Sequence, residues 1–298
     1  ERERVTQFVG VPTMSWDMLE HPDFAKYDTS SLQSVGGGGA PAPADPASPD
    51  ATADPDAGPA LAAQGGRFTR PFTPLDGRPP LAIVLMDSGA DPELRASLAA
   101  APFPVTLALD PSIVGARDIA RDWVAAGQEL VLIAAGLPAG ATASDAETLL
   151  EALETAFPAA IAVLDGPSGG TGGGPGAGTG GGFQSDLQTA LAVVPAIGAR
   201  ALGLVTWERG LNSADQIARR EGIASARLFR DLDAEGENAT TIGRYLDRAA
   251  FRAAQEGRVT VAGRMRPETV RAVMEWALQG GRAETVVLAP LSAILAMP

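Results

Sequence analysis

The sequence predicts an α/β fold, a parallel (β/α)7-8 distorted TIM-like barrel preceded by a disordered linker. From residue 80 onward, short continuous apolar runs follow one another, as expected of buried parallel strands. Stretches with helical periodicity lie between them, and such alternation forms a parallel sheet with crossover helices. The apolar runs cover residues 81–86, 104–109, 129–134, 160–164, 201–206, 224–229, 258–263 and 285–290.

The helical stretches carry recognisable starts and ends. Residues 112–127 place their apolar side chains along one stripe of a helix. Ser144 precedes an acidic first turn and is expected to cap the next helix. Gly257 is expected to end a helix, because glycine accepts the left-handed backbone found there. Pro267 stands where proline favours the first turn of a helix.

A doubly wound open sheet is the structural rival of the barrel. That fold binds dinucleotides through a glycine fingerprint after its first strand, and none follows residues 81–86. The number of strand–helix units matches a barrel, complete or incomplete. We therefore favour a barrel over residues 80–298.

Two segments precede the barrel. Residues 1–35 form an N-terminal arm that carries His21, with a turn or two of helix expected around 14–19. Residues 36–79 form a linker rich in Pro, Ala and Gly. Residues 36–66 of it have almost no large apolar side chains to offset the entropy of ordering, so we expect disorder there. The linker is either a tether or a spacer without function.

Composition excludes several classes of function. The chain has 298 residues and a net charge of −13, which argues against a non-specific nucleic-acid binder and a polybasic membrane-surface protein. It has no cysteine, so thiolate metal sites, Fe–S clusters and cysteine nucleophiles are excluded. Its single histidine cannot form a multi-histidine metal site within one chain. No apolar run reaches the roughly 20 residues that a membrane-spanning helix needs.

Residues 166–182 are glycine-dense and directly follow the fourth apolar run. Glycine at this density has no single preferred backbone, so we expect a mobile loop that folding does not require. The loop lies at the carboxyl end of a strand, where barrel enzymes keep their chemistry. A dinucleotide fingerprint matches inside it only by chance, because the real motif opens a helix after the first strand. We expect no cofactor.

Aspartates stand at the ends of several predicted strands. Asp87, Asp165 and Asp231 each come directly after or close after an apolar run. The carboxyl ends of parallel strands meet at one rim, so these three are candidate catalytic residues, acting as general acid and base or holding a hard cation. The alternative is that each caps the helix or loop that follows it.

The order of several motifs resembles a known family. RPPLAIVLMDSGAD, FPVTLALDP and LVLIAAGLPAG come first, and GFQSD, SADQIARREGI, VAGRMRPETVRAVMEWAL and VVLAPLSAIL follow. Together they resemble the bacterial divergent polysaccharide deacetylases over essentially all of residues 80–295. The resemblance implies a distorted (β/α) barrel in an exported or envelope-attached protein. It further implies deacetylation of amino sugars by a divalent metal, held by one Asp and two His, with another Asp as base.

The chain departs from this family pattern at its metal and catalytic positions. The paired Asp of the first strand reads Met86-Asp87, and a later strand-end Asp falls on Thr206 or Trp207. A late motif with two His reads Gly263-Arg264-Met265-Arg266 and loses both. Arg and Met cannot replace imidazole as ligands to such a cation, so we expect no Asp–His–His metal site. A carboxylate-only Mg²⁺ or Ca²⁺ site stays open as the alternative.

Two classes of function follow. In the first, the barrel is a catalytically degenerate member that binds a cell-wall or envelope polysaccharide, or an envelope protein. Its rim would then grip a sugar face or a carboxylated polymer. In the second, it is an active deacetylase or hydrolase with rebuilt carboxylate chemistry at the rim aspartates. We favour the first. The residues expected to contact the ligand are Trp207, Arg209, Arg264 and Arg266.

Location follows from the resemblance. The chain starts at Glu1 without an initiator Met, which leaves open the alternative that an N-terminal signal or anchor was removed. The expected location is the periplasm, free or anchored to the inner membrane. We expect no nucleic-acid partner.

Overall fold

The computed structural model describes residues 67–298 together with the backbone of three short strands nearer the N-terminus, except for a few internal and terminal positions. The helical turn expected around 14–19, and most of the stretch expected to be disordered, lie outside the described residues. The positions not described within 67–298 are 76, 135–136, 138–139, 167–181, 209, 280 and 298.

The chain divides into two compact units, Glu1–Ala57 and Gly58–Pro298. In the first unit, β1 (Gln7–Gly10) pairs in parallel with β2 (Ser34–Gly37). The second unit contains the barrel and begins with an antiparallel pair. This pair consists of β3 (Ala62–Gln64) and β4 (Arg67–Thr69).

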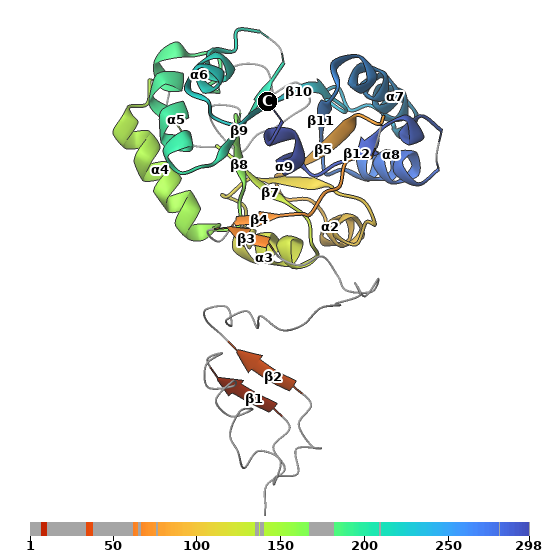
Figure 1. Ribbon diagram of the computed structural model, residues 1–298, viewed down its shortest axis with the longest axis horizontal. Helices are drawn as coiled ribbons and strands as arrows, with labels where there is room; N and C mark the ends of the chain where they lie inside the picture. The colour runs from red at the N-terminus through yellow and green to blue at the C-terminus, as the bar shows by residue number, and fades with distance from the viewer. Residues whose placement is uncertain are drawn as a thin grey trace, which may run out of the picture. The chain divides into compact units, whose positions relative to one another are not determined.

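Seven parallel strands form a closed barrel, because β11 pairs back onto β5 (Figure 1). The closing register places Leu81 opposite Val259 and Met86 opposite Arg264. Closure confirms the predicted barrel and rejects the open sheet. A short eighth strand, β12 (Val287–Leu288), pairs with the start of β5. The ring strands are β5 (Pro80–Asp87), β6 (Thr106–Leu109), β7 (Leu130–Ile133), β8 (Ala162–Leu164), β9 (Gly203–Trp207), β10 (Ser225–Asp231) and β11 (Val259–Arg264).

Crossover helices pack around the ring (Figure 1). In the described part of the chain, no helix is both long enough and apolar enough to cross a membrane. A 3-10 turn, Gly281–Thr285, precedes β12. The helices are α2 (Pro92–Ala99), α3 (Ala116–Ala125), α4 (Ala143–Ala156), α5 (Leu187–Ala199), α6 (Ser213–Glu221), α7 (Ala239–Glu256), α8 (Pro267–Leu278) and α9 (Leu291–Leu295).

Two of the predicted helix boundaries are confirmed and one is wrong. Gly257 ends α7 with a φ of 81°, and Pro267 begins α8. The cap of α4 is Thr142 rather than Ser144. The Thr142 hydroxyl accepts from the backbone N–H of Asp145, whose carboxylate accepts from the Thr142 N–H at 2.9 Å. This reciprocal capping box needs a three-residue spacing to an acid, and Ser144 lacks that spacing to Asp145.

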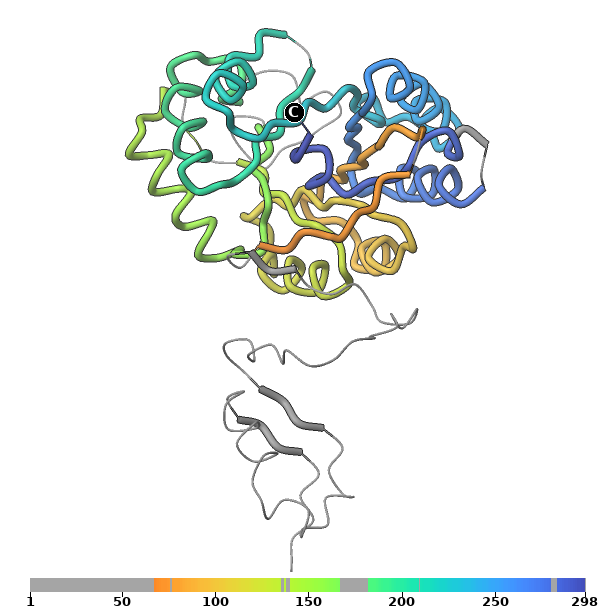
Figure 2. Tube along the Cα trace, viewed as in Figure 1, coloured from red at the N-terminus to blue at the C-terminus, as the bar shows by residue number. Residues whose placement is uncertain are grey.

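The inside of the barrel is filled by small and branched apolar side chains, including Val84, Val131 and Val205. Helix α9 adds Leu291 and Ile294 to the same cluster. Figure 2 shows α9 within the outline of the ring. A packed interior of this kind leaves the carboxyl-end rim as the place for a site.

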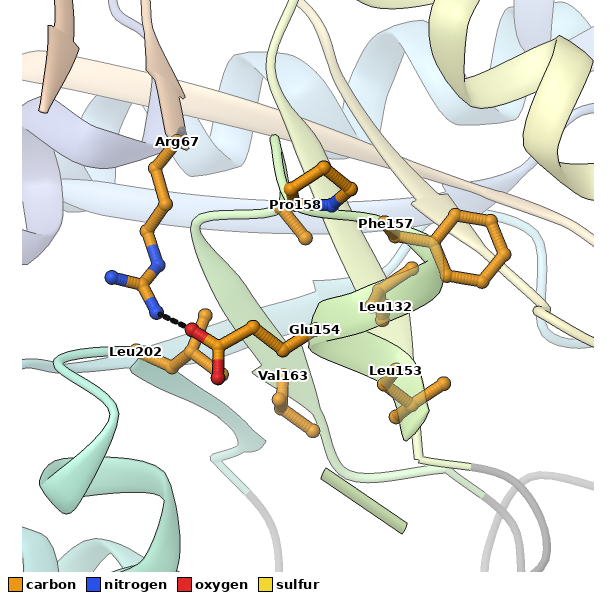
Figure 3. A pocket seen from close by; sticks show the side chains of 9 residues that line it. Arg67, Leu132, Leu153, Glu154, Phe157, Pro158, Val163 and Leu202 are labelled. Carbon is orange, nitrogen blue, oxygen red and sulfur yellow. Dashed lines mark hydrogen bonds and ion pairs between the residues drawn. The ribbon is translucent and has the colours of Figure 1, made fainter. Parts of the chain in front are cut away.

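Residues 67–70 lie within the range predicted as linker, yet they contact the barrel. Phe68 is buried, and its N–H donates to the carbonyl of Ala159 at 3.1 Å. Arg67 forms an ion pair of 2.8 Å with Glu154 of α4 (Figure 3). These contacts together attach the stretch to the barrel, and composition averaged over the linker conceals them.

Glu129, directly before β7, is a buried carboxylate at the end of the barrel opposite the rim. Its side chain is 1% exposed and accepts from the N–H of Arg70 and of Ser292, each at 2.9 Å, and from the Ser292 hydroxyl. Burial raises the pKa of Glu129, and the hydrogen bonds from Ser292 and Arg70 oppose that rise. One carboxylate therefore joins the segment before β5, strand β7 and helix α9.

Candidate functional site

The three candidate aspartates all lie at the carboxyl ends of ring strands. Asp87 ends β5, Asp165 follows β8 and Asp231 ends β10. Their side chains share no hydrogen-bond partner among the described residues, so each belongs to a local network of its own.

Asp87 is held as an anion at the start of the β5–α2 connection. Its fully buried carboxylate accepts from the N–H of Gly89 at 2.8 Å, from the N–H of Ala90 at 2.7 Å and from Arg95 of α2. Burial alone would raise the pKa of Asp87, but these hydrogen bonds, led by that of Arg95, bring it below its usual value. This geometry matches the alternative that Asp87 caps the loop after its strand.

Asp165 contacts the backbone of the residues that follow the glycine-dense segment in the sequence. It is 5% exposed and accepts from the N–H of Gln184 at 3.3 Å. Burial raises the pKa of Asp165 to about 7, against the hydrogen bonds from the Gln184 and Phe183 N–H groups. Gly182 must lack a side chain, because a Cβ there would lie 2.3 Å from the Asp165 carboxylate.

Gln184 connects Asp165 to β9. Its side chain accepts from the N–H of Trp207 at 2.7 Å and donates to the Trp207 carbonyl at 3.2 Å. The backbone of Trp207 is thus fixed from the neighbouring connection, and its ring packs partly against the barrel interior. The carboxyl of Asp165 and the aromatic ring of Trp207 belong to one connected unit.

A third network contains two aspartates and two arginines. Arg264, at the end of β11, contacts Asp231 at 3.4 Å and Asp233 at 3.0 Å. The carboxylate of Asp233 is fully buried and also contacts Arg266 at 3.4 Å and the Thr269 hydroxyl at 2.5 Å. Burial raises the pKa of Asp231, and the charge of Arg264 opposes that rise. Arg264 and Arg266, expected to face a ligand, are engaged by carboxylates of the chain itself.

A cavity of about 280 Å³ opens beside this network, between the ends of β9 and β10, the loop after β10 and α7. Trp207 and Asp231 are part of its wall, so the cavity brings together two of the predicted site residues. Arg209 lies outside the described residues. The other wall residues are Glu208, Leu228, Phe229, Arg230, Ala234, Glu235, Glu237 and Tyr245.

Several residues of these networks were not predicted from the sequence. Arg95 stands eight positions after Asp87, in the second turn of α2, which is a spacing without a motif. Gln184 lies in the GFQSD stretch, but nothing in the sequence tells which strand it contacts. Arg230 and Tyr245 meet because α7 folds back over β10.

The metal site that the fold family implies does not fit these residues. The Asp231 and Asp233 carboxylates already face the guanidinium of Arg264, whose charge would repel a cation. Within the described residues, no group of three or more His, Cys, Asp or Glu side chains is arranged to hold a metal ion.

Solved structures with a similar fold are known. An uncharacterised protein from Agrobacterium tumefaciens C58 superimposes with a TM-score of 0.62, at 20% identity, over 75% of this chain and 92% of that one. The catalytic domain of peptidoglycan N-acetylglucosamine deacetylase from Eubacterium rectale ATCC 33656 gives a TM-score of 0.46, at 11% identity, over 73% and 90%. The first of these supports the barrel fold alone. No curated protein matches the sequence.

The sequence itself matches a family. Residues 83–295 fit the family described as divergent polysaccharide deacetylase, a range that begins within β5 and includes the other six ring strands. The resemblance carried by the motif order is thereby confirmed. The chain belongs to the divergent polysaccharide deacetylase family.

The raised pKa of Asp165 makes a prediction about stability. A folded-state pKa of about 7 means that the folded protein keeps a proton that the unfolded chain releases near pH 4. Stability should therefore fall as pH rises from about 4 to about 7, by at most about 1.4 kcal/mol per pH unit from this group. Asp165→Asn should remove that share of the slope, as measured by urea unfolding across this range.

The difference in this slope between Asp165→Asn and the wild-type protein gives the contribution of Asp165 apart from that of the other carboxyl groups. Asp118→Asn, a change at an exposed side chain of α3, is the matched control and should leave the slope as it is. An unchanged slope in Asp165→Asn would mean that Asp165 is ionised in the folded protein throughout.

Proposed function

We propose that the barrel binds a carbohydrate polymer at its carboxyl-end rim and does not perform metal-assisted deacetylation. The family acts on polysaccharides, which supports a carbohydrate as the ligand. The chemistry of this rim supports binding without hydrolysis.

The observation that carries the proposal is the state of the rim carboxylates. Asp87 is bound by Arg95, and Asp231 and Asp233 are bound by Arg264. A metal ion would have to displace these guanidinium groups, each of which makes charge-assisted hydrogen bonds. Thioethers such as that of Met265 are poor ligands for a hard or borderline cation.

The cavity supports the binding half of the proposal. It combines the aromatic side chains of Trp207 and Tyr245 with charged groups at the edge. Concave sites of this kind hold small ligands through apolar faces and a few directed polar groups. The C–H faces of a sugar ring can pack against the aromatic side chains, and its hydroxyl groups can form hydrogen bonds with the polar groups.

A hydrolase with rebuilt carboxylate chemistry is the second candidate, and Asp165 favours it. A carboxyl with a pKa of about 7 can both donate and accept a proton near neutral pH. A positioned acid or base of this kind contributes typically about 10² to 10⁴ in rate. Asp87 and Asp231 have less capacity for this role, because each is bound to an arginine.

We also propose a location in the cell envelope, in the periplasm or anchored to the inner membrane. The family is the support for this location and for an envelope polysaccharide or protein as the partner. Fractionation of the source cells tests it, and recovery in the cytosol would contradict it.

The functional test measures binding and acetate release together. The full chain is titrated with acetylated chito-oligosaccharides and peptidoglycan fragments, with and without Zn²⁺ or Co²⁺. We expect binding without acetate release, and about tenfold weaker binding in Trp207→Ala, since loss of an aromatic contact costs about 1.4 kcal/mol. Leu211→Ala, at an exposed residue of the β9–α6 connection, is the control.

Each other outcome decides between the candidates. Metal-stimulated acetate release that is lost in Asp87→Ala would overturn the proposal. Metal-independent release lost in Asp165→Asn would establish the hydrolase instead. A thermal melt of every variant shows whether a loss reflects unfolding.

A further inference from the structure

We propose that Arg230 is the anion-binding group of the cavity, and that the glycan recognised there is acidic and carries a carboxylate on its sugar ring. This inference rests on the proposed glycan binding and narrows it to one chemical class. Arg230 is the one lysine or arginine in the described wall of the cavity. It extends from the carboxyl end of β10, next to the ring strand that carries Trp207.

The Arg230 guanidinium lies over an aromatic ring of the same cavity. Its central carbon lies 3.8 Å from the centre of the Tyr245 ring, which is stacking distance. Tyr245 comes from α7 and lines the same cavity. A stacked guanidinium keeps its edge free for two parallel hydrogen bonds, the arrangement that matches a carboxylate.

Arg230 has no counter-charge within the described residues. Among the described residues, no carboxylate forms an ion pair with its guanidinium, and its guanidinium donates no side-chain hydrogen bond. Its Nε is buried and lacks an acceptor in the same part of the chain. A partly buried cation without a partner is costly, and such groups point to a missing ligand.

Two of the acids that line the cavity are paired with other arginines. Glu208 forms a 2.9 Å ion pair with Arg252, and Asp231 contacts Arg264 at 3.4 Å. Both acids line the cavity, yet each forms its ion pair with an arginine other than Arg230. An incoming carboxylate would therefore meet one unpaired guanidinium beside two neutralised ion pairs.

Glu235 and Glu237 also line the cavity and oppose an anion, which makes them useful for the test. Glu235 is exposed, and its charge is hydrated and screened by salt. Arg230 is stacked and partly desolvated, so its attraction for a carboxylate is screened less. The observations thus favour an acidic ligand over an ammonium-bearing one, which would prefer the two glutamates.

The experiment compares ligands that differ in charge. Oligogalacturonate is titrated into the full chain beside its methyl ester of the same length, and beside acetylated and deacetylated chito-oligosaccharides. We expect the free acid to bind at least about tenfold more tightly than the ester at low salt, with the difference shrinking as salt rises. The acetylated chito-oligosaccharide reports on the proposed function by itself.

Substitutions then test the sign of the interaction. Arg230→Gln should abolish the preference for the acid, and Arg230→Lys should keep a smaller preference because it retains the charge without the planar fork. Glu235→Gln should strengthen binding of the acid about two- to threefold. Arg121→Gln, at an exposed arginine of α3, is the control and should change nothing.

The outcomes separate this inference from the proposed function. Equal binding of acid and ester, alongside binding of the acetylated chito-oligosaccharide, overturns the acidic ligand and leaves glycan binding standing. Preference for the deacetylated sugar, weakened by Glu235→Gln, identifies a cationic ligand and also overturns it. Binding of none of the four overturns both proposals. If Arg230→Gln has a lowered melting temperature, the Arg230→Lys variant and the salt dependence of binding to the wild-type protein still test whether Arg230 binds the carboxylate.

Discussion

Replacing Glu129 with alanine is expected to lower the free energy of unfolding by about 3 to 5 kcal/mol. The side chain is buried and accepts from three donors, two backbone N–H groups and the Ser292 hydroxyl. Alanine leaves all three without an acceptor, and each buried orphan costs about 1 to 3 kcal/mol. It also leaves a cavity that the packed surroundings fill only in part. Urea unfolding followed by circular dichroism measures the loss.

Two controls locate the effect. Ser292→Ala removes a single hydroxyl and should cost about 1 kcal/mol, because both backbone donors keep their acceptor. Glu151→Ala, at an exposed residue of α4, should stay within about 0.5 kcal/mol of the wild-type protein. A loss below about 1 kcal/mol in Glu129→Ala would show that the segments it joins are held by apolar packing instead.

Replacing Asp233 with alanine is expected to have an effect of similar size, about 3 to 5 kcal/mol, at the opposite end of the barrel. Its buried carboxylate is shared by Arg264, Arg266 and the Thr269 hydroxyl. Removing Asp233 takes away the carboxylate that pairs with Arg266 and leaves Arg264 with Asp231 alone, which is costly in a buried ionic network. The β10–α7 connection, the end of β11 and α8 lose their common attachment. Denaturant unfolding of the full chain gives the magnitude.

The contrast with a surface pair makes this prediction specific. Asp118 and Arg121 form a 2.9 Å ion pair on α3 in which both side chains are 69% exposed. Asp118→Ala should cost at most about 1 kcal/mol, since solvent screens such pairs. Equal losses in the two variants would mean that burial of Asp233 does not strengthen its contacts. Thr269→Val, which removes a single donor, should fall between them.

The sequence predicts the positions of the strands better than it predicts the pairing that closes the barrel. Continuous apolar runs such as LAIVLM mark buried strands wherever they occur, and β5 covers that run with one residue added at each end. Closure depends on β11 pairing with β5, and no local pattern records a pairing between such distant segments. The packed segment at Phe68 was missed because a single aromatic residue disappears in a composition average over the linker.

The sequence predicts where the rim aspartates lie better than it predicts which side chains they contact. Asp87, Asp165 and Asp231 stand at strand ends, as their sequence positions require. Their partners were not predictable, because Arg95 and Gln184 follow no periodic spacing from the acids. The whole of α7 separates Arg264 and Arg266 from Asp231 and Asp233 in the sequence. The pairing of β10 with β11 brings these residues together. Arg264 and Arg266, which were expected to bind a ligand, therefore form ion pairs within the chain instead.

The order of the ring has a consequence for how the protein is made. Leu81 of β5 pairs with Val259 of β11. The first ring strand therefore cannot form this pairing until the residues between the two strands, and β11 itself, have been synthesised. During that interval one edge of β5 has no ring neighbour, and an unpaired strand edge readily pairs with other chains. Contacts this distant also slow folding, because the long loop must close before they form. Helix α9 follows all seven ring strands in the sequence, so Leu291 and Ile294 are the last residues of the interior cluster to be synthesised. Until β11 is synthesised, the growing barrel is thus an open sheet whose first strand keeps one edge unpaired.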